Sequence, residues 1–338
     1  MLSKDMALKD NFIEDYRNRV FDKENRSYLM GIAILWIVLL HFYCWFQGKL
    51  PWWIYFFSDG GTGVDIFLFL SAYGLEASYR KNGWSIFYRN RAKRILPVYL
   101  VFLVFVFGLF MNEVPIGDIL KQCAAQLTGI SLFQEPKFFS THFEFDWFTP
   151  ALIIYYLLYP AISFILNFLA KRNIGAEILL LFFLFIISLL ALRSIQLPIK
   201  LFLYRLPVFT LGAITYIHMK DKQTNRLLIL YTITIIGGLL SNQHWFLTSS
   251  IVPSLLLVYS MVEGRRPFKK TISLIGRHSY EVYLAHIFPV TNFFMIYVFD
   301  NIYLYSAVTI LWTIVVATVF SVSQKYINLA INYRKLTP

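Results

Sequence analysis

The sequence predicts an all-α membrane protein that crosses the bilayer about ten times. Hydrophobic residues make up 58% of the chain and charged residues only 15%, which is more apolar side chain than a soluble domain can bury. The apolar residues gather in stretches, most of which approach the roughly 20 helical residues that span a hydrocarbon core of about 30 Å. In chain order, the predicted spans are 28–47, 62–78, 95–112, 147–169, 176–194, 201–219, 227–241, 245–262, 279–299 and 303–324.

The basic residues divide the connections between these spans into two sets. When the connections alternate between inside and outside, starting with the N-terminus inside, the inner set holds 25 of the 31 Lys and Arg. Basic residues favour the cytoplasmic side during insertion, so this asymmetry supports the span count and predicts an inner-membrane protein with both termini in the cytoplasm. The net charge of +12 therefore needs no nucleic-acid partner. The inner segments are 1–26, 80–94, 171–172, 220–226, 265–277 and 325–335.

The chain is predicted to be one transmembrane domain, residues 27–331, between the cytoplasmic tails 1–26 and 332–338. The N-terminal tail is charged and lacks the features of a cleavable signal peptide, and it forms either a surface helix or a solvated tail. The two cysteines, Cys44 and Cys123, make neither a disulfide framework nor a metal motif. No phosphate loop, dinucleotide fingerprint, zinc cluster or nucleophile elbow is present in the sequence.

The first two spans each carry an ionisable side chain, which is costly in a membrane and usually faces the interior or a water-filled cavity. His41 follows Tyr28 by thirteen residues, which places it about 20 Å from the inner end of its span. Asp65 lies close to the outer end of the next span, after a short outer connection. We expect the two at similar depth, where the carboxylate can orient the imidazole and raise its basicity. Alternatively, His41 bonds a backbone carbonyl and only packs, but the neighbouring Asp65 favours a functional role.

A basic cluster stands at the inner entrance of the third span. Residues 89–94 contain four cations in six positions, two of which are Arg91 and Arg94. Such a cluster can hold phosphate groups through bidentate arginine contacts. It can also simply set the topology or contact anionic lipids, and charge alone favours this second interpretation.

Two features of the predicted outer side are candidate ligand contacts: a basic residue that is unusual on that side, and a long loop. Arg205 is a cation at the outer start of the sixth span, so we expect it to have a specific partner; otherwise it extends to the outer headgroups. The outer loop 113–146 is the longest on that side and carries His142 among several carboxylates. It either binds a polar acceptor or is a solvated loop.

The ninth span carries a histidine about 10 Å from its inner end. His286 is spaced to share a helix face with Ser279 and Tyr283. Packing is the simpler role for the tyrosines.

Four segments together resemble the membrane acyltransferase-3 family, the multi-span O-acyltransferases that modify bacterial surface glycans. They occur in the family's order and extend over most of the chain, and it is the ordered set, not any one piece, that is specific. The segments are Gly31-Ile32-Ala33-Ile34-Leu35 followed by His41, Gly63-Val64-Asp65-Ile66-Phe67-Leu68-Phe69-Leu70-Ser71, Arg91-x-x-Arg94-Ile95-Leu96-Pro97-x-Tyr99, and Ser279-Tyr280-x-x-Tyr283-Leu284-x-His286.

The chain departs from the family pattern at two places. The family usually has an arginine or lysine eleven residues before the first-span histidine, and here that residue is Met30. Arg26, one turn earlier, is the candidate to replace it. The family's Ser-Gly pair in the second segment is Ser71-Ala72 in this chain, which is a mild change.

The resemblance implies a cytoplasmic acyl-CoA donor, most often acetyl-CoA, and an acceptor hydroxyl on an extracytoplasmic or lipid-linked glycan. It also implies a central polar cavity through which the donor reaches His41. His41 would act as general base or carry the acyl group itself, with Asp65 orienting it. Donor phosphates are expected at Arg91, Arg94 and Arg26, with membrane lipids as the other partners and no metal. The residues expected to contact the acceptor are Arg205, Ser71, Tyr283, His286 and His142.

A transporter or flippase for a lipid-linked glycan is the main competing interpretation. Gly237-Gly238 and Pro253 mark candidate broken helices in the seventh and eighth spans. The sequence shows no corresponding pair of interrupted helices in two halves, which weakens this interpretation. A non-catalytic membrane scaffold would not need His41 and Asp65 together.

Overall fold

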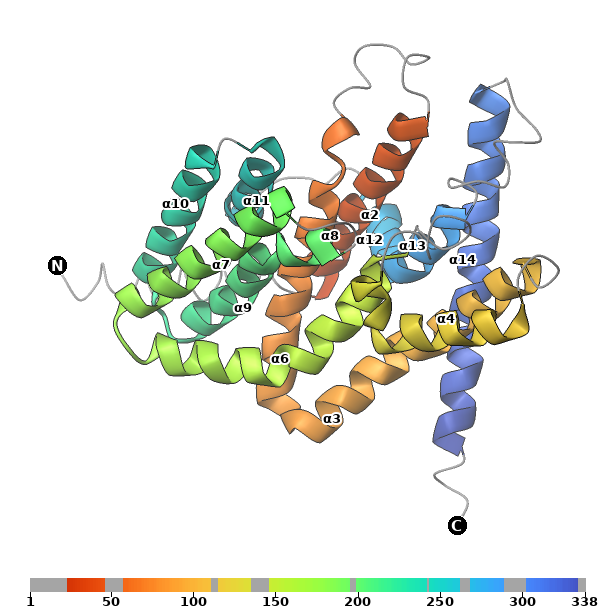
Figure 1. Cartoon of the computed structure of the whole chain (residues 1–338), viewed down its shortest axis with the longest axis horizontal. Helices are drawn as coiled ribbons and strands as arrows, with labels where there is room; N and C mark the ends of the chain where they lie inside the picture. Colours follow the sequence, from red (N-terminus) through yellow and green to blue (C-terminus); the bar gives the residue numbers. More distant parts are fainter. Residues whose placement is uncertain are drawn as a thin grey trace. The chain divides into compact units, whose positions relative to one another are not determined.

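The computed structural model describes residues 23–45, 57–110, 115–134, 146–194, 199–241, 243–261, 268–288 and 302–333, and these ranges are helical without strands (Figure 1). The predicted all-α class is therefore confirmed for the described part of the chain. The elements are α2 (Lys23–Trp45), α3 (Thr62–Phe110), α4 (Ile116–Thr128), the 3-10 turn η2 (Ile130–Phe133), α6 (Phe148–Ala170), α7 (Ile174–Ser194), α8 (Ile199–Leu203), α9 (Leu206–Lys220), α10 (Thr224–Leu240), α11 (His244–Met261), α12 (Lys269–Arg277), α13 (Ser279–Phe288) and α14 (Ile302–Tyr333).

Five helical segments of the described ranges are long and apolar enough to cross a membrane. Two further apolar helices, Thr224–Leu240 and Phe246–Leu256, are shorter. The helices thus support a membrane protein, whereas ten crossings and a central polar cavity are not confirmed. The five segments are Glu24–Cys44, Phe148–Ala170, Ile174–Arg193, Ile199–Lys220 and Tyr303–Asn332.

The basic segment 80–94 is helical, and not the polar loop that hydropathy predicts. α3 runs through the predicted second and third spans and is interrupted at Gly83, whose φ of 69° and ψ of 176° lie outside the helical region. Arginine, lysine and alanine favour helix as strongly as apolar residues do, so polarity alone does not end a helix here. Glycine takes the positive φ without the steric cost that a side chain brings.

Two other predicted segments have internal structure that hydropathy does not show. The sixth span, 201–219, is divided at Arg205 into α8 and α9, with Pro207 in the first turn of α9 where its missing N–H is tolerated. Part of the predicted outer loop 113–146 is structured, because it contains α4 and η2.

The chain forms two compact units, which are described separately below. The first unit comprises residues 1–81, 161–195 and 200–277, and the second comprises 82–160, 196–199 and 278–338. Two of the boundaries fall close to Gly83 in α3 and at Pro160 inside α6.

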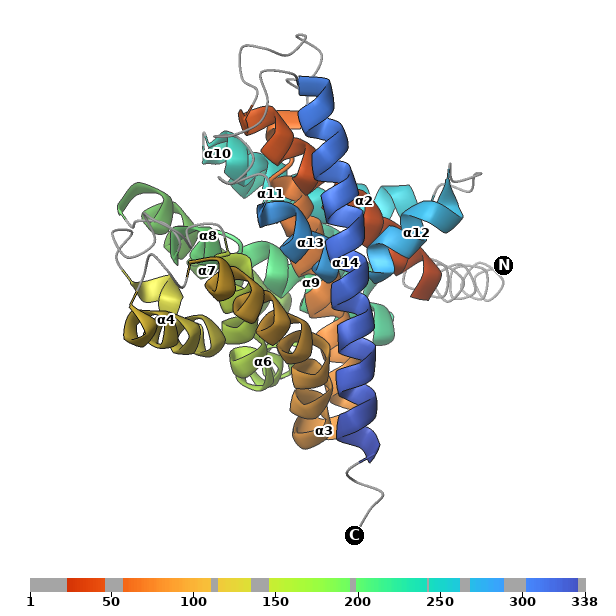
Figure 2. The ribbon, with the colours of Figure 1, turned by 90° about the vertical axis from the view of Figure 1, so that its right-hand side faces the viewer.

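In the first unit, contacts join pairs of connecting segments that were predicted to lie on the same side of the membrane. Asp59 Oδ1 lies 3.5 Å from His244 Nδ1, and both belong to predicted outer connections. Glu24 Oε2 lies 3.1 Å from Lys269 Nζ, and both belong to predicted inner segments. α12 packs beside α2 (Figure 2). These contacts agree with an alternating topology.

In the second unit, the later half of α3 packs against α14. Gln324 Nε2 donates to the carbonyl of Arg94 at 2.7 Å, and the rings of Phe102 and Phe320 lie 6.3 Å apart. α13 lies alongside α14 (Figure 2), where Ser321 Oγ and His278 Nδ1 are 3.1 Å apart. The second unit therefore builds on a helix pair that includes Arg94.

The alternating topology gives a direct labelling prediction. In a Cys44→Ser/Cys123→Ser background, we expect His244→Cys to react with an impermeant thiol reagent in intact cells. We expect Lys325→Cys to react only after permeabilisation, because Lys325 belongs to the predicted inner segment 325–335. Both residues are exposed, His244 at the start of α11 and Lys325 within α14, so accessibility within the protein does not decide the result. The opposite labelling pattern would contradict the predicted orientation.

Candidate active site

Asp65 and Arg205 form a buried ion pair in the first unit. The carboxylate Oδ1 lies 3.2 Å from the guanidinium Nε, and the two side chains are 2% and 4% exposed. Ser249 of α11 donates a hydrogen bond to the same carboxylate. Arg205 therefore has a specific partner, as its sequence position predicted.

The remaining contacts of Arg205 fix it at the junction of α8 and α9. Its Nη2 donates to the carbonyl of Gly61 at 3.3 Å, and its Nη1 donates to the carbonyl of Leu201 at 3.2 Å. The guanidinium also lies 4.1 Å from the centre of the Tyr204 ring. One arginine thus holds the start of α3 against the α8–α9 junction.

Two glycines let these helices approach closely enough for the pair to form. A Cβ on Gly63 of α3 would lie 2.5 Å from the carbonyl oxygen of Ala33 in α2. A Cβ on Gly212 of α9 would lie 2.2 Å from the carbonyl oxygen of Phe69 in α3. Both distances are shorter than side chains tolerate, so α2 and α9 cross α3 where only glycine fits.

His41 lies in the last turns of α2 and is partly exposed. Trp36 Nε1 donates to the carbonyl of Asp59 at 3.0 Å, whereas Gly63 faces Ala33. In this antiparallel register, Asp65 lies near the level of Ala33, and His41 lies eight residues, about 12 Å, further along α2. The expected equal depth of His41 and Asp65 is therefore not what the structure shows.

In the second unit, Arg91 and Arg94 lie on α3. Arg94 is exposed, while Arg91 is partly buried with its guanidinium 5.9 Å from the Phe87 ring and 6.0 Å from the Tyr156 ring. The Arg91 Nε is buried and has no hydrogen-bond partner in the described part of the chain. A buried donor of this kind is normally satisfied, so the Arg91 guanidinium keeps one N–H that can donate to a further acceptor.

The other predicted donor and acceptor residues have separate surroundings. Arg26 belongs to the first unit, where its Nη1 would lie 3.0 Å from a Cβ on Gly74. Ser71 is partly exposed on α3 in the same unit. His142 lies outside the described residues.

Tyr283 of the second unit belongs to a buried polar cluster around Asp146. Its hydroxyl donates to Asp146 Oδ1 at 3.1 Å, and the backbone N–H of Thr149 donates to the same oxygen at 3.1 Å, which caps the first turn of α6. Tyr280 donates to the Thr149 hydroxyl at 3.3 Å. His286 is buried, with its ring 5.8 Å from that of Tyr283.

The same cluster keeps unused hydrogen-bonding capacity. Tyr99 donates to Gln126 Oε1 of α4 at 2.9 Å and also hydrogen-bonds Asp146. Gln122 is 3% exposed, and its side-chain nitrogen and oxygen have no hydrogen-bond partner among the described residues. Asp146 Oδ2 has no partner among them either. These groups together can accept and donate hydrogen bonds to a ligand hydroxyl.

Asp146 has a contact that the sequence did not predict. The sequence placed it in an outer loop, but its carboxylate contacts Tyr99, which follows Arg94 by five residues, about 7.5 Å along α3. Asp146 thus lies near the basic segment of α3.

A family model described as an acyltransferase domain, that of the acyltransferase-3 family, matches residues 27–323. The chain belongs to this family. The match covers nearly the whole chain and contains both buried clusters. Comparison with curated proteins and with solved structures gives no significant match.

The membrane acyltransferase also holds a polar network that the sequence analysis overlooked. Glu76 of α3 is fully buried, and its Oε1 lies 2.6 Å from Arg80 Nε and accepts from Asn167 Nδ2 of α6 at 2.9 Å. Arg80 also donates to the Asn167 side-chain oxygen. Its guanidinium lies 5.7 Å from the ring of Tyr216 in α9. The network links α3, α6 and α9 of the first unit.

A second overlooked pair joins α7 and α9 of the acyltransferase. His218 Nε2 and Glu177 Oε1 are 2.8 Å apart, and both side chains are buried. Ionisable residues inside apolar spans, the signal used for His41 and Asp65, also mark Glu76 and Glu177 in the sequence.

Proposed function

We propose that the protein is a multi-pass O-acyltransferase of the bacterial inner membrane. It transfers an acyl group, expected to be acetyl, from cytoplasmic acyl-CoA to a hydroxyl of an extracytoplasmic or lipid-linked glycan. The observation that carries the proposal is the family match over residues 27–323, which includes the His41 and Asp65 segments. Incubation of the purified protein with labelled acetyl-CoA and surface glycan tests the activity. Mass spectrometry of surface glycans from a deletion strain and its parent then identifies the acceptor.

The donor is proposed to bind at the basic segment of α3. Arg91 and Arg94 contact the phosphates of CoA, because Arg91 has a buried, unpartnered N–H and Arg94 is exposed one turn away. The rings of Phe87 and Tyr156 keep the Arg91 guanidinium in place. In the first unit, Arg26, beside Gly74, is a separate proposed donor contact, since Met30 stands where the family usually has a basic residue.

His41 is the proposed catalytic residue. As general base, its imidazole takes the proton from the acceptor hydroxyl while the oxygen bonds to the acyl carbon, the carbon–sulfur bond breaks, and the CoA thiolate receives a proton. Alternatively, His41 carries the acyl group between the two substrates. Asp65 is the proposed positioning residue, and Arg205 holds its carboxylate at 3.2 Å.

Arg205 and Ser71 are proposed acceptor contacts in the first unit, and the tyrosine cluster around Asp146 is by itself a proposed acceptor site in the second unit. Tyr283 and His286 lie in or beside that cluster, and His142 is a further proposed contact. Asp146 and Gln122 join this proposal because each has an unpartnered polar atom among the described residues. Hydroxyl-rich ligands are bound by such groups beside aromatic rings.

Arg94→Ala is expected to raise the Michaelis constant for acetyl-CoA by about 10- to 100-fold while changing the acceptor constant little. A hydrogen bond to a charged group contributes about 1.5–3 kcal/mol, which gives this range. Initial rates at varied donor and acceptor concentrations provide the measurement. Lys325→Ala, which removes another exposed cation from the basic set, is the matched control. An unchanged donor constant in an inserted Arg94→Ala protein would leave the cluster as a topology signal only.

A further inference from the structure

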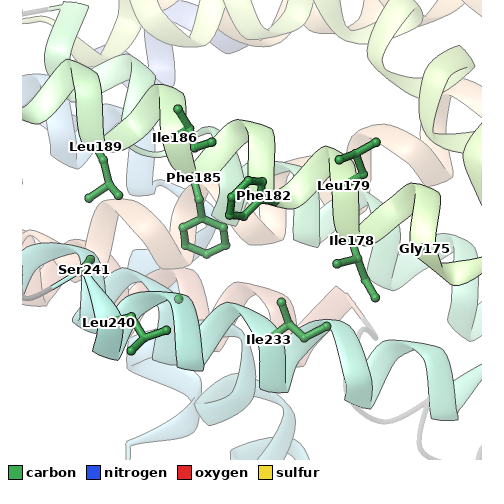
Figure 3. Close-up of a pocket in the computed structure, with 11 residues that line it drawn as sticks. Gly175, Ile178, Leu179, Phe182, Phe185, Ile186, Leu189, Ile233, Leu240 and Ser241 are labelled. Carbon is green, nitrogen blue, oxygen red and sulfur yellow. The ribbon is translucent and has the colours of Figure 1, made fainter.

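An apolar groove runs between α7 and α10 in the first unit (Figure 3). Its volume is about 420 Å³. The α7 residues recur three or four positions apart, so they occupy one face of that helix, and Phe182 and Phe185 project from the middle of it (Figure 3). The lining residues are Gly175, Ile178, Leu179, Phe182, Phe185, Ile186, Leu189, Ile233, Gly237, Leu240 and Ser241.

The groove is open to the surroundings of the protein. Leu179 is 68% exposed, Phe182 61% and Leu240 81%. α7 is one of the segments long and apolar enough to cross the membrane, so these side chains face hydrocarbon. From Gly175 to Leu189 the groove follows fourteen residues of α7, or about 21 Å, which exceeds the roughly 15 Å depth of one leaflet's hydrocarbon. Its length and chemistry fit a lipid acyl chain.

One end of the groove is basic. α7 begins at Ile174, two residues after Arg172, and Lys171 and Arg172 are both exposed. Arg226 of α10 donates to the carbonyls of Ala170 at 3.0 Å and Arg172 at 3.2 Å, so the start of α10 is fixed to the same connection. Three positive charges therefore gather where the apolar groove reaches the membrane surface.

We propose that this groove is a binding site for an anionic phospholipid. One acyl chain occupies the space between α7 and α10, and the phosphate group contacts Lys171 and Arg172. Basic pockets at the ends of membrane helices select anionic head groups, whereas the apolar groove by itself accepts a chain of any phospholipid. The combination predicts both retention of lipid and selectivity for negative charge. The proposal is independent of the catalytic mechanism.

The charge part of the site is tested by lipid retention. The protein is exchanged into nanodiscs of phosphatidylcholine with phosphatidylglycerol, extracted with mild detergent and examined by native mass spectrometry. We expect one phosphatidylglycerol retained in preference to phosphatidylcholine. Lys171→Gln/Arg172→Gln should lower this preference by about tenfold or more, because each cation near an anionic surface contributes about fivefold. Lys325→Gln, a matched loss of an exposed lysine on α14, should leave it unchanged.

The groove itself is tested with Gly237→Leu. A Cβ at this position would lie 3.5 Å from the Phe185 ring, so a leucine fills the groove. We expect loss of bound phospholipid of either headgroup. Ile236→Leu is the matched control, because Ile236 is exposed beside Gly237 but does not line the groove. Leu179→Trp obstructs the open side if Gly237→Leu does not insert.

Equal retention of the two phospholipids by the wild type would overturn the proposal, and so would unchanged retention in Gly237→Leu or Leu179→Trp. Retention of a polyprenyl phosphate instead of phospholipid in protein extracted directly from cells would also overturn it. That result would assign the groove to the carrier of a lipid-linked acceptor.

Discussion

Replacement of His41 by alanine is expected to abolish acyl transfer by the purified protein. Loss of a general base typically costs about 10²–10⁴ in rate, and loss of an acyl carrier removes the reaction path altogether. Transfer of labelled acetyl groups from acetyl-CoA to glycan is the measurement. Because His41 is partly exposed in the last turns of α2, the substitution leaves no large cavity, and thermal unfolding in detergent should change little.

A matched control and a second readout make the result specific. His244→Ala removes a histidine that is 62% exposed and should retain normal turnover. Incubation with labelled acetyl-CoA alone, followed by rapid quenching, distinguishes the two routes, since only an acyl carrier leaves label on the wild type and none on His41→Ala. Near-normal turnover in His41→Ala would end the proposed mechanism, and the transporter interpretation would then take precedence.

Apolar length predicts many of the helices well. α6 and α7 begin and end within about two residues of the predicted spans 147–169 and 176–194, because the run of apolar side chains that fits the bilayer is itself the structural unit. Hydropathy does not report helix propensity, which is why the basic segment 80–94 was predicted as a polar connection, whereas it is helical on both sides of a break at Gly83.

The sequence predicted the individual residues of the first unit's candidate site, but it did not predict that Asp65 pairs with Arg205. Both Asp65 and Arg205 stand out as ionisable residues at outer span ends, yet their contact depends on α9 crossing α3 at Gly212, which hydropathy cannot locate. Equal spacing from the outer connection predicted His41 beside Asp65. The actual register, with Gly63 against Ala33, is set by close helix packing.

The position of Asp146 depended on an element that composition does not reveal. α4 is too short and too polar to be recognised as a span, but Gln126 bonds Tyr99 and the chain then returns to the same place. Tyr283 was singled out from helix spacing, and the structure gives it Asp146 as a partner. Its role toward the acceptor stays a prediction.

Breaking the Asp65–Arg205 pair is expected to have the second large effect. Arg205→Met leaves the Asp65 carboxylate buried without its cation, and losing one partner of a buried pair costs about 3–5 kcal/mol of unfolding free energy. Asp65→Asn leaves Arg205 buried and should destabilise the protein similarly. The double variant Asp65→Asn/Arg205→Met removes both charges, so it should recover most of the stability. Thermal unfolding in one detergent compares the four proteins.

Turnover in the same four proteins separates two roles of Asp65. If Asp65 positions His41, the stable double variant still has low turnover, because a neutral amide stabilises the imidazolium less and can favour the wrong tautomer. Asp65→Asn should then add little to the loss caused by His41→Ala, since the two residues act as one unit. Recovery of turnover together with stability in the double variant would show that Asp65 only ties α3 to the α8–α9 junction. The offset between the levels of Asp65 and His41, about eight helical residues or about 12 Å, makes this comparison decisive, because a positioning role then requires α2 to shift along α3 when substrate binds.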